Sequence, residues 1–346
     1  MPKYASNMAN SDYSRLERFL HRLALSWQPM LELTFQAEKA MFKSDLSGAR
    51  DSHVFIAGLA RSGSTMILSA LYRTGRFRSL IYRDMPFVLA PNLWRKITGT
   101  KKRAREPRER SHGDRIKVNV DSPEALEEVF WRMVTEGAYI HKHSLRPHSI
   151  TEGQIQEFRT FVNLVLNQSS ANRYLSKNNN NILRLNALHK AFPDAHIVIP
   201  FRHPLEQAYS LLNQHRRFLK VHKNDPFSKD YMDWLAHHEF GANHKPCMFS
   251  EERAEASTGS LDYWLRNWIH VYSHLADEAP ANTIWISYEQ LCSSTSEVWS
   301  RLNHELDLNH AHCPVEMSAS IHSMEGGYDE GLYKEARLLY ERLLDS

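Results

Sequence analysis

One stretch constrains the fold of this chain more than any other: residues 53–75, which read HVFIAGLARSGSTMILSALYRTG. The apolar run at 54–57 is bounded by a glycine, a pattern that predicts a short buried strand. A polar, glycine-containing loop follows at 58–65, and apolar residues then recur with helical spacing. A strand, a glycine loop and a helix in this order direct backbone N–H groups and a helix N-terminus at an anion. The stretch therefore predicts an anion-binding loop.

The loop can be compared with the Walker A pattern, G-x-x-x-x-G-K-[ST], which it matches only in part. Gly58 and Gly63 have the required spacing and Thr65 stands at the Ser/Thr position, but Ser64 replaces the lysine. Arg61 supplies a cation inside the loop instead. An ordinary ATP or GTP site is therefore not expected. On this loop alone, a turn that merely joins a strand to a helix is an equally good interpretation.

A second stretch with the same order of features begins at residue 196. The apolar run 196–199 predicts another buried strand, and Pro204 suits the first turn of the helical pattern that follows. Arg202 falls at the end of the strand, and Ser210 lies eight residues further on, inside the predicted helix. Parallel strands bring their carboxyl ends to one edge of a sheet. The two stretches together predict an α/β fold with a P-loop-type parallel sheet flanked by helices.

Together these stretches resemble the PAPS-dependent sulfotransferases, where PAPS is 3′-phosphoadenosine 5′-phosphosulfate. In that family a loop of the form [RK]-x-G-[ST]-[ST] holds the 5′-phosphosulfate. The matching residues here are Arg61, Ser62, Gly63, Ser64 and Thr65. In the family a strand-end arginine and a serine eight residues on hold the 3′-phosphate, which implies these roles for Arg202 and Ser210. The resemblance implies sulfuryl transfer from PAPS, with adenosine 3′,5′-bisphosphate as product and no metal ion.

Two further segments agree with this resemblance, which runs from about residue 53 to about residue 302. Lys177 precedes an asparagine and a leucine-rich segment, as a lysine does in tyrosylprotein sulfotransferases, and would add a catalytic cation. Residues 285–289 read WISYE and look like the family's late strand and turn, which implies that Tyr288 lies near the adenine. The chain lacks the loop lysine and the K-T-H segment of cytosolic sulfotransferases, so it is closer to the tyrosylprotein and bacterial types.

The sequence offers two candidates for the base that removes a proton from the acceptor. In tyrosylprotein sulfotransferases the base is an acidic residue about twenty positions beyond the loop arginine. This implies the role for Asp84, which lies 23 residues after Arg61. His112 is the alternative, because histidine titrates near neutral pH. A purely structural role for Asp84, in a turn before Pro86, is the other interpretation.

Positive charge is concentrated in one segment of the chain. Residues 95–117 contain ten Lys/Arg and three Asp/Glu, a net of +7, whereas the whole chain carries +3 and the remainder therefore 3 − 7 = −4. The segment has too few apolar residues to form a core. It is interpreted as a solvated loop, a lid over the anionic donor or a dock for an acidic acceptor.

Two other classes of function stay open beside sulfuryl transfer. One is a P-loop kinase with a degenerate loop, although the loop lysine and a Walker B aspartate after an apolar strand are missing. The other is a non-catalytic nucleic-acid binder that uses residues 95–117, although that segment lacks interleaved aromatic residues.

The cysteines and the N-terminus bear on the cellular setting. Cys247, Cys292 and Cys313 are too few and too scattered for a disulfide framework or a C-x-x-C metal site, which predicts reduced thiols in the cytoplasm. No signal-peptide core or transmembrane length is seen, so we expect no stable membrane insertion. The expected acceptor is a small molecule, lipid or glycan precursor, with no nucleic-acid partner.

The twenty histidines lack metal-ligand spacing and are interpreted as solvated surface residues.

The expected organisation is a helical N-terminal arm at 1–50 and a sulfotransferase domain at 51–346. In the arm, apolar spacing predicts two helices that pack on the domain, with a homodimer contact as the alternative. Within the domain we expect a helix capped by Ser122 with Pro123 in its first turn. Residues 220–258 are interpreted as an acceptor-side insertion. A later aromatic helix containing Trp268 is expected in the core, with a role in lining the acceptor site as the alternative.

Overall fold

The computed structural model describes residues 13–42, 52–99, 119–167, 169–250, 257–317 and 326–346, and the backbone of 108–109 and 117–118. The strands are β1 (Val54–Ile56), β2 (Phe77–Arg78), β3 (Arg108–Glu109), β4 (Lys117–Val118), β5 (Arg173–Lys177), β6 (His196–Phe201) and β7 (Thr283–Ser287). The helices of the first half are α1 (Arg15–Ser26), α2 (Gln28–Met41), α3 (Ser64–Arg73), η1 (Tyr82–Asp84), α4 (Pro91–Thr98), α5 (Glu128–Val134) and α6 (Glu152–Leu166). Those of the second half are η2 (Asn179–Leu183), α7 (Leu185–Ala191), α8 (Pro204–Asn224), α9 (Pro226–Trp234), α10 (Leu261–Glu278), α11 (Tyr288–Ser293), α12 (Thr295–Glu305) and α13 (Glu330–Leu344).

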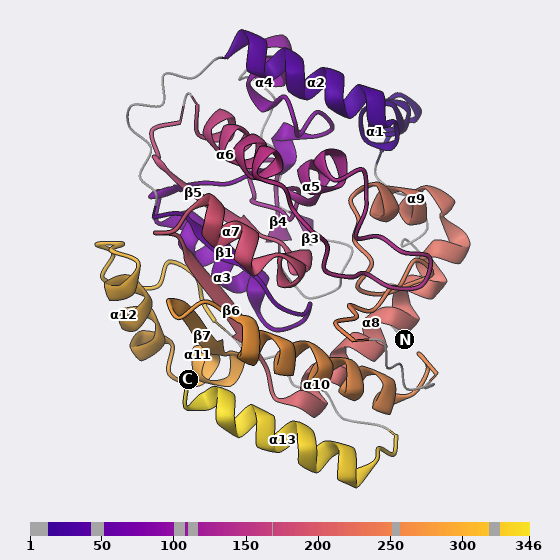
Figure 1. The fold of residues 1–346 in the computed structure, drawn as a ribbon, viewed down its shortest axis with the longest axis vertical. Coiled ribbons are helices and arrows are strands. Elements are labelled where there is room, and N and C mark those ends of the chain that lie inside the picture. Colours follow the sequence, from indigo (N-terminus) through magenta and orange to yellow (C-terminus); the bar gives the residue numbers. More distant parts are fainter. Residues whose placement is uncertain are drawn as a thin grey trace.

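Five strands form one parallel sheet in the order β2-β5-β1-β6-β7, which confirms the predicted fold class. The central strand β1 pairs with β5 on one side, where Ile56 lies opposite Lys177, and with β6 on the other, where Ile56 lies opposite Val198. A parallel sheet buries both faces, so its strands read as continuous apolar runs. The carboxyl ends of β5, β1 and β6 therefore lie side by side at one edge (Figure 1).

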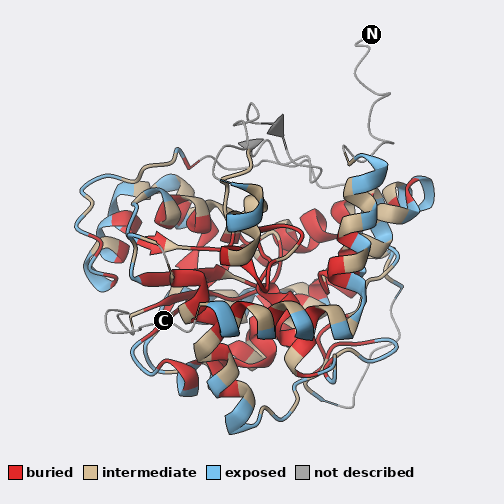
Figure 2. Ribbon diagram, turned by 90° about the horizontal axis from the view of Figure 1, so that it is seen from above, coloured by how far each residue is buried: buried red, intermediate tan, exposed pale blue. Residues whose placement is uncertain are grey.

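Helices cover both faces of the sheet, as the alternating side chains of β1 show. Val54 and Ile56 lie in a buried cluster with side chains of α3 and α12. Phe55 points the other way, into a cluster with α5, α6 and α2. A third cluster packs α8, α10 and α13 against β6. Buried residues accordingly fill the sheet and the inner sides of the helices, and exposed residues lie on their outer sides (Figure 2).

Strand β5 lies in the middle of the sheet, yet the sequence did not predict it. Its sequence, RYLSK, carries polar residues at three of five positions, so it does not read as an apolar run. Buried Arg173 is satisfied by donating to the carbonyl oxygens of Ser52 at 2.6 Å and Leu306 at 2.6 Å. Because of these polar residues, the apolar pattern that predicts a buried strand is absent from β5.

One predicted helix boundary was wrong. The helix expected from Ser122 begins at Glu128 instead, because Ser122 Oγ accepts from the backbone N–H of Asn119 at 3.0 Å within a turn. Pro123 forms an isolated bridge with Ile81 rather than a first helical turn. The segment 220–258 contains the end of α8 and all of α9, and its interpretation as an acceptor-side insertion stays a prediction.

The N-terminal arm forms two helices as predicted, but α1 does not bury its apolar stripe. Leu16, Phe19 and Trp27 are 67%, 60% and 54% exposed, whereas α1 meets the rest of the protein through His21 and Leu25. The second helix, α2, does join the core. No helix among the described residues is long and apolar enough to cross a bilayer.

The prediction of solvated histidines was wrong for a large part of the set. His141 and His143 are exposed, but His53, His215, His222 and His238 are buried. Buried histidines of this kind replace solvent by backbone partners; His53 Nδ1, for example, accepts from the N–H of Tyr174 at 3.0 Å. Burial, followed by the charge of Arg173, lowers the pKa of His53 to about 4.

This shift gives the protein an acid-sensitive stability. Above pH 6.5 His53 is neutral in both states, and between about pH 6.5 and 4 only the unfolded chain binds the proton, so stability falls as the pH falls through that window. At pH 5 the loss from His53 alone should be about 2 kcal/mol. In denaturant titrations from pH 7 to 5, His53→Asn, which keeps an acceptor, should show a shallower loss than wild type. His141→Asn serves as the exposed control, and equal slopes for wild type and His53→Asn would contradict the assignment.

Candidate active site

The glycine loop of residues 58–65 connects the end of β1 to the start of α3, as predicted. Gly63 is the N-cap of α3 with φ 90°, and its carbonyl oxygen accepts from the N–H groups of Met66 and Ile67. Arg61 has φ 70°, a left-handed backbone conformation that is uncommon for residues other than glycine. The first N–H groups of a helix have no partner within the helix and carry partial positive charge. The loop therefore has the geometry of an anion site.

Tyr288 explains why position 63 must be glycine. A Cβ atom on Gly63 would lie 2.8 Å from Cδ2 of Tyr288, closer than any ordinary contact. The guanidinium carbon of Arg202 lies 4.5 Å from the centroid of the same ring. One aromatic side chain, from the first residue of α11, thus contacts both the loop after β1 and the arginine after β6.

The two motifs of the sequence meet directly. Arg61 Nε donates to Ser210 Oγ at 3.0 Å, although the residues are 149 positions apart. Gln207 Nε2, one turn earlier in α8, donates to the carbonyl oxygen of Ala60 at 3.0 Å. The first three turns of α8 therefore lie against the glycine loop. The structure brings the predicted residues Arg61, Ser210 and Arg202 to one edge of the sheet.

Arg202 lies directly after β6, where α8 begins at Pro204, and is 3% exposed. Its Nη2 atom contacts Glu206 Oε2 at 3.1 Å, one turn into α8. The guanidinium is thus oriented by an ion pair and by the face of Tyr288, a cation–π contact. Such an arrangement suits an arginine that presents donors to an oxyanion.

Lys177 is the last residue of β5 and lies opposite Ile56, immediately before the glycine loop. A carboxylate that the sequence did not single out, Glu239, is within range of the lysine charge. Glu239 Oε1 accepts from Asn179 Nδ2 at 2.5 Å. Burial would raise the pKa of this carboxyl, but the charges of His237 and Lys177 hold it below its usual range. The charge of Lys177 at the end of β5 therefore acts on a carboxylate of the loop after α9.

Of the two candidate bases, Asp84 lies among the described residues and His112 does not. Asp84 ends η1, where its Oδ2 accepts from Arg78 Nη2 at 2.8 Å and from the N–H of Ile81 at 2.9 Å. Arg78 lies opposite Tyr174, three residues before Lys177 in β5. These contacts anchor the segment after β2, and the catalytic role of Asp84 stays a prediction. His112 and most of the basic segment 95–117 lie outside the described residues.

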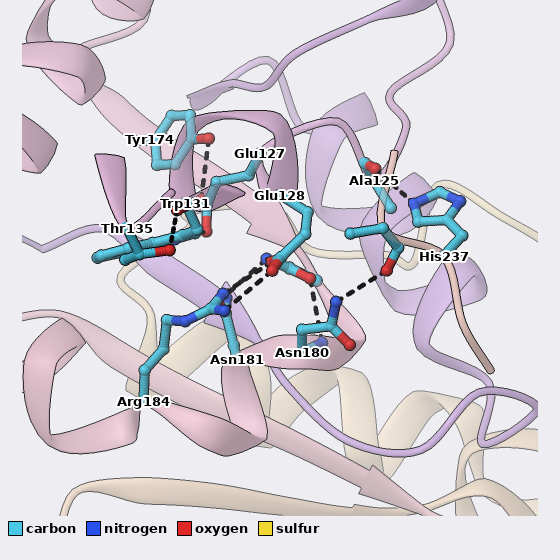
Figure 3. Close-up of polar contacts among 12 residues, drawn as sticks. Ala125, Glu127, Glu128, Trp131, Thr135, Tyr174, Asn180, Asn181, Arg184 and His237 are labelled. Atoms are coloured by element: carbon cyan, nitrogen blue, oxygen red, sulfur yellow. Dashed lines mark hydrogen bonds and ion pairs between the residues drawn. The ribbon is translucent and has the colours of Figure 1, made fainter. Parts of the chain in front are cut away.

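A buried ion pair supports the chain that follows Lys177 (Figure 3). Arg184 donates to Glu128 through Nη1 at 2.7 Å and Nη2 at 2.9 Å, and Asn178 Nδ2 donates to the same carboxylate at 2.5 Å. The guanidinium lies over the rings of Trp131 at 4.9 Å and Tyr139 at 4.8 Å. Burial would raise the pKa of Glu128, but Arg184 holds it below its usual range. The pair ties α5 to the 178–184 segment.

The neighbouring carboxylate has a different environment. Glu127 Oε1 accepts from Trp131 Nε1 at 3.1 Å, and Oε2 accepts from the hydroxyl of Tyr174 at 3.0 Å (Figure 3). Burial raises its pKa, whereas at Glu128 the charge of Arg184 outweighs the same effect. On the far side of the segment, Asn180 Nδ2 donates to the carbonyl oxygen of Ala236. The loop that carries Glu239 is thereby joined to the same polar network.

Metal-ligating groups are not gathered in the described part of the chain: no group of three or more His, Cys, Asp or Glu there could hold a metal ion. Trp268, for which lining the acceptor site was the alternative interpretation, is fully buried and donates through Nε1 to Gln207 at 3.0 Å. Its place is in the core.

Comparison with known proteins agrees with these features. The model of the sulfotransferase family matches residues 53–246, which is more than half of the 346-residue chain. The chain belongs to the sulfotransferase family. The match begins at the strand before the glycine loop and includes Lys177, Arg202 and Ser210. It ends before β7, so Tyr288 and α13 lie outside it.

The chain also shows a weak similarity to three solved structures that are described as sulfotransferases. Sulfotransferase STF9 from Mycobacterium avium is 13% identical with a TM-score of 0.45, and the match covers 97% of this chain and 79% of that one. Sulfotransferase STF1 from Mycobacterium tuberculosis H37Rv is 12% identical with a TM-score of 0.45, covering 96% and 86%. A sulfotransferase from Alicyclobacillus acidocaldarius is 13% identical with a TM-score of 0.39, covering 86% and 94%. No curated protein matches the chain by sequence.

The buried pair beneath the site gives a stability prediction. The Arg184 and Glu128 side chains are 0% and 1% exposed, so Glu128→Gln leaves an uncompensated buried guanidinium. We expect Glu128→Gln to lower the free energy of unfolding by about 3–5 kcal/mol in denaturant titrations. The double variant Glu128→Gln/Arg184→Met should recover part of this loss.

A surface pair provides the control for that experiment. Arg337 and Glu341 form an exposed ion pair on α13, so Arg337→Met should leave the unfolding midpoint unchanged. A Glu128→Gln variant as stable as wild type would show that the buried pair does not stabilise the fold.

Proposed function

We propose that this sulfotransferase moves the sulfuryl group from PAPS to a hydroxyl or amine of its acceptor. The observation that carries the proposal is the hydrogen bond from Arg61 to Ser210, which joins the loop assigned to the 5′-phosphosulfate to the helix assigned to the 3′-phosphate. Membership of the family supports the transfer reaction, and the shared sheet edge supports one nucleotide bound across both motifs.

In this proposal the nucleotide lies along the carboxyl edge of the sheet. The 5′-phosphosulfate accepts from the backbone N–H groups at Gly63, Ser64 and Thr65, at the N-terminus of α3. The 3′-phosphate accepts from Arg202 and the hydroxyl of Ser210. The adenine lies near Tyr288.

Positioning and charge stabilisation would supply most of the catalysis. As the acceptor oxygen forms its bond to sulfur, the bond from sulfur to the bridging oxygen breaks, and that oxygen gains negative charge. Arg61 and Lys177 would stabilise the charge, together with the loop N–H groups. The acceptor proton passes to a base, for which we propose Asp84, with His112 as the alternative. The donor and product would be PAPS and adenosine 3′,5′-bisphosphate, and no step requires a metal ion.

The acceptor class and the cellular setting are proposals as well. Cys247, Cys292 and Cys313 are all free thiols, in keeping with a cytoplasmic enzyme. Burial raises the pKa of Cys247 to about 12, which makes it an unreactive thiol. A cytoplasmic metabolite, lipid or glycan precursor is the proposed acceptor.

Calorimetric titration separates this function from its alternatives. Adenosine 3′,5′-bisphosphate should bind more tightly than ATP or a single-stranded oligonucleotide. Preferred binding of ATP would favour the degenerate kinase, and preferred binding of the oligonucleotide the nucleic-acid binder. Labelled PAPS with pools of phenols, amines, sugars and lipids then identifies the acceptor.

The 3′-phosphate assignment predicts a selective loss on changing Arg202. A hydrogen bond to a charged group contributes about 1.5–3 kcal/mol, so Arg202→Ala should weaken binding of adenosine 3′,5′-bisphosphate at least tenfold. Binding of adenosine 5′-monophosphate should hardly change. Arg216→Ala, at an exposed position on the same helix, is the control. Equal losses for both nucleotides would refute the assignment.

The proposed base predicts a loss in rate without a loss in cofactor binding. Removal of a general base lowers the rate by about 10²–10⁴-fold, so Asp84→Asn should lower kcat on that scale and leave the affinity for adenosine 3′,5′-bisphosphate intact. His112→Ala should have a mild effect.

Because Asp84 also contacts Arg78, the melting temperature of Asp84→Asn must be measured beside its activity. A variant that is less stable but fully active would assign Asp84 a structural role, and a dead His112→Ala variant would reverse the two roles.

A further inference from the structure

The C-terminal helix α13 contacts the segment that carries Arg202. The hydroxyl of Tyr340 donates to Glu289 Oε2 at 3.0 Å, and the hydroxyl of Tyr333 lies 3.3 Å from Nε2 of His203. The two tyrosines are seven positions apart and therefore lie on the same face of the helix. Their rings are 5.6 and 6.0 Å from that of His203. This face of α13 is thus directed at the residue that follows Arg202.

Glu289 joins three elements through its two carboxylate oxygens. Oε1 accepts from the backbone N–H of His203 at 3.0 Å. Oε2 accepts from the hydroxyl of Ser287 at 3.1 Å as well as from Tyr340. The end of β7, the start of α8 and the last turns of α13 are therefore fixed to one another by a single side chain.

These contacts act on the position of Arg202 from the backbone side, in addition to the ion pair between its guanidinium and Glu206. Its backbone is held at the next residue, His203, by Glu289. Its guanidinium lies on the ring of Tyr288, the residue that precedes Glu289. The carboxylate of Glu289 thus holds the backbone next to the cation, and the ring that supports the cation belongs to the residue before Glu289. A small shift of Glu289 would move the arginine and its support together.

We propose that Glu289 and Tyr340 are positioning residues for recognition of the 3′-phosphate, and that α13 is a working part of the nucleotide site. The inference rests on the proposed function, in which Arg202 binds that phosphate. It concerns residues beyond 246, where the match to the family ends, so it assigns a role to a part of this chain that the family match does not cover. The Glu289 carboxylate would act as a hydrogen-bond acceptor, one residue away from the groups that contact the nucleotide.

The role can be separated from simple packing of the helix. Leu332, Ala336 and Leu343 bury the adjoining stripe of α13 in the core cluster with α8 and α10, and the rings of Tyr333 and Tyr340 pack against the same cluster. These apolar contacts do not involve the tyrosine hydroxyls. Tyr340→Phe therefore removes one hydrogen bond from Glu289 without removing the apolar contacts that hold the helix. Changes in nucleotide selectivity then report on the position of Arg202 rather than on the presence of α13.

The experiment measures the affinity of the full chain for two nucleotides that differ only in the 3′-phosphate. In calorimetry, Glu289→Ala should weaken adenosine 3′,5′-bisphosphate about tenfold and Tyr340→Phe about threefold, with binding of adenosine 5′-monophosphate nearly unchanged. Glu289→Gln, which keeps an acceptor oxygen for the N–H of His203, should retain most of the wild-type selectivity. The ratio of the two affinities is the quantity compared, because loss of folded protein would lower both equally.

Matched controls lie in the same C-terminal segment. Tyr328→Phe removes a hydroxyl for which no hydrogen bond is found among the described residues, and Glu335→Gln neutralises an exposed carboxylate of α13. Both should bind the two nucleotides as wild type does. If Tyr340→Phe and Glu289→Ala leave the ratio of affinities at the wild-type value, the proposal is overturned while the function stands. A wild-type protein that binds the two nucleotides equally would instead contradict the proposed function, and with it this role.

Discussion

Parallel pairing of β1 with β5 and β6 is the constraint on which the rest of the structure depends. Strands that run the same way end at the same edge, so the glycine loop, Lys177 and Arg202 emerge side by side although the chain separates them widely. The hydrogen bond from Arg61 to Ser210 is the direct result of this pairing. A sheet of mixed direction would place one of these groups at the opposite edge and leave the anion loop without its second arginine.

Beneath and beside this edge the structure is held by polar groups as well as by apolar packing. Glu128 and Arg184 hold the segment after β5, and Glu289 holds the segment after β6. Apolar contacts tolerate small displacements, whereas a buried charge that loses its partner costs several kcal/mol. Polar supports of this kind therefore help to fix backbone positions, and they occur where loops carry the candidate site residues.

The sequence predicted the parts of the site that are local. The strand, glycine loop and helix of residues 53–75, and the strand with Arg202 and Ser210, are each encoded within a few turns of chain, so apolar runs and glycine positions reveal them. Strand β5 was missed because its polar residues are satisfied by partners more than a hundred positions away. Glu239 and Tyr340 were missed for the same reason, since nothing near them in sequence indicates where the fold takes them. Glu289 was placed in the turn after the last strand, but its contacts with His203 and Tyr340 could not be read from the sequence.

The position of Tyr288 has a consequence for how the two ends of the site behave together. Its ring contacts the glycine loop at Gly63 and carries the Arg202 guanidinium, and an aromatic ring has no internal torsion to absorb a shift between its neighbours. In the proposed function, a displacement at one end would therefore be transmitted to the other, and ligand groups bound at the two ends would be coupled. The ring would preset the separation between the glycine loop and Arg202, the two groups proposed to bind the phosphates. Such preorganisation lowers the entropic cost of binding a ligand of matching length and penalises one of any other length.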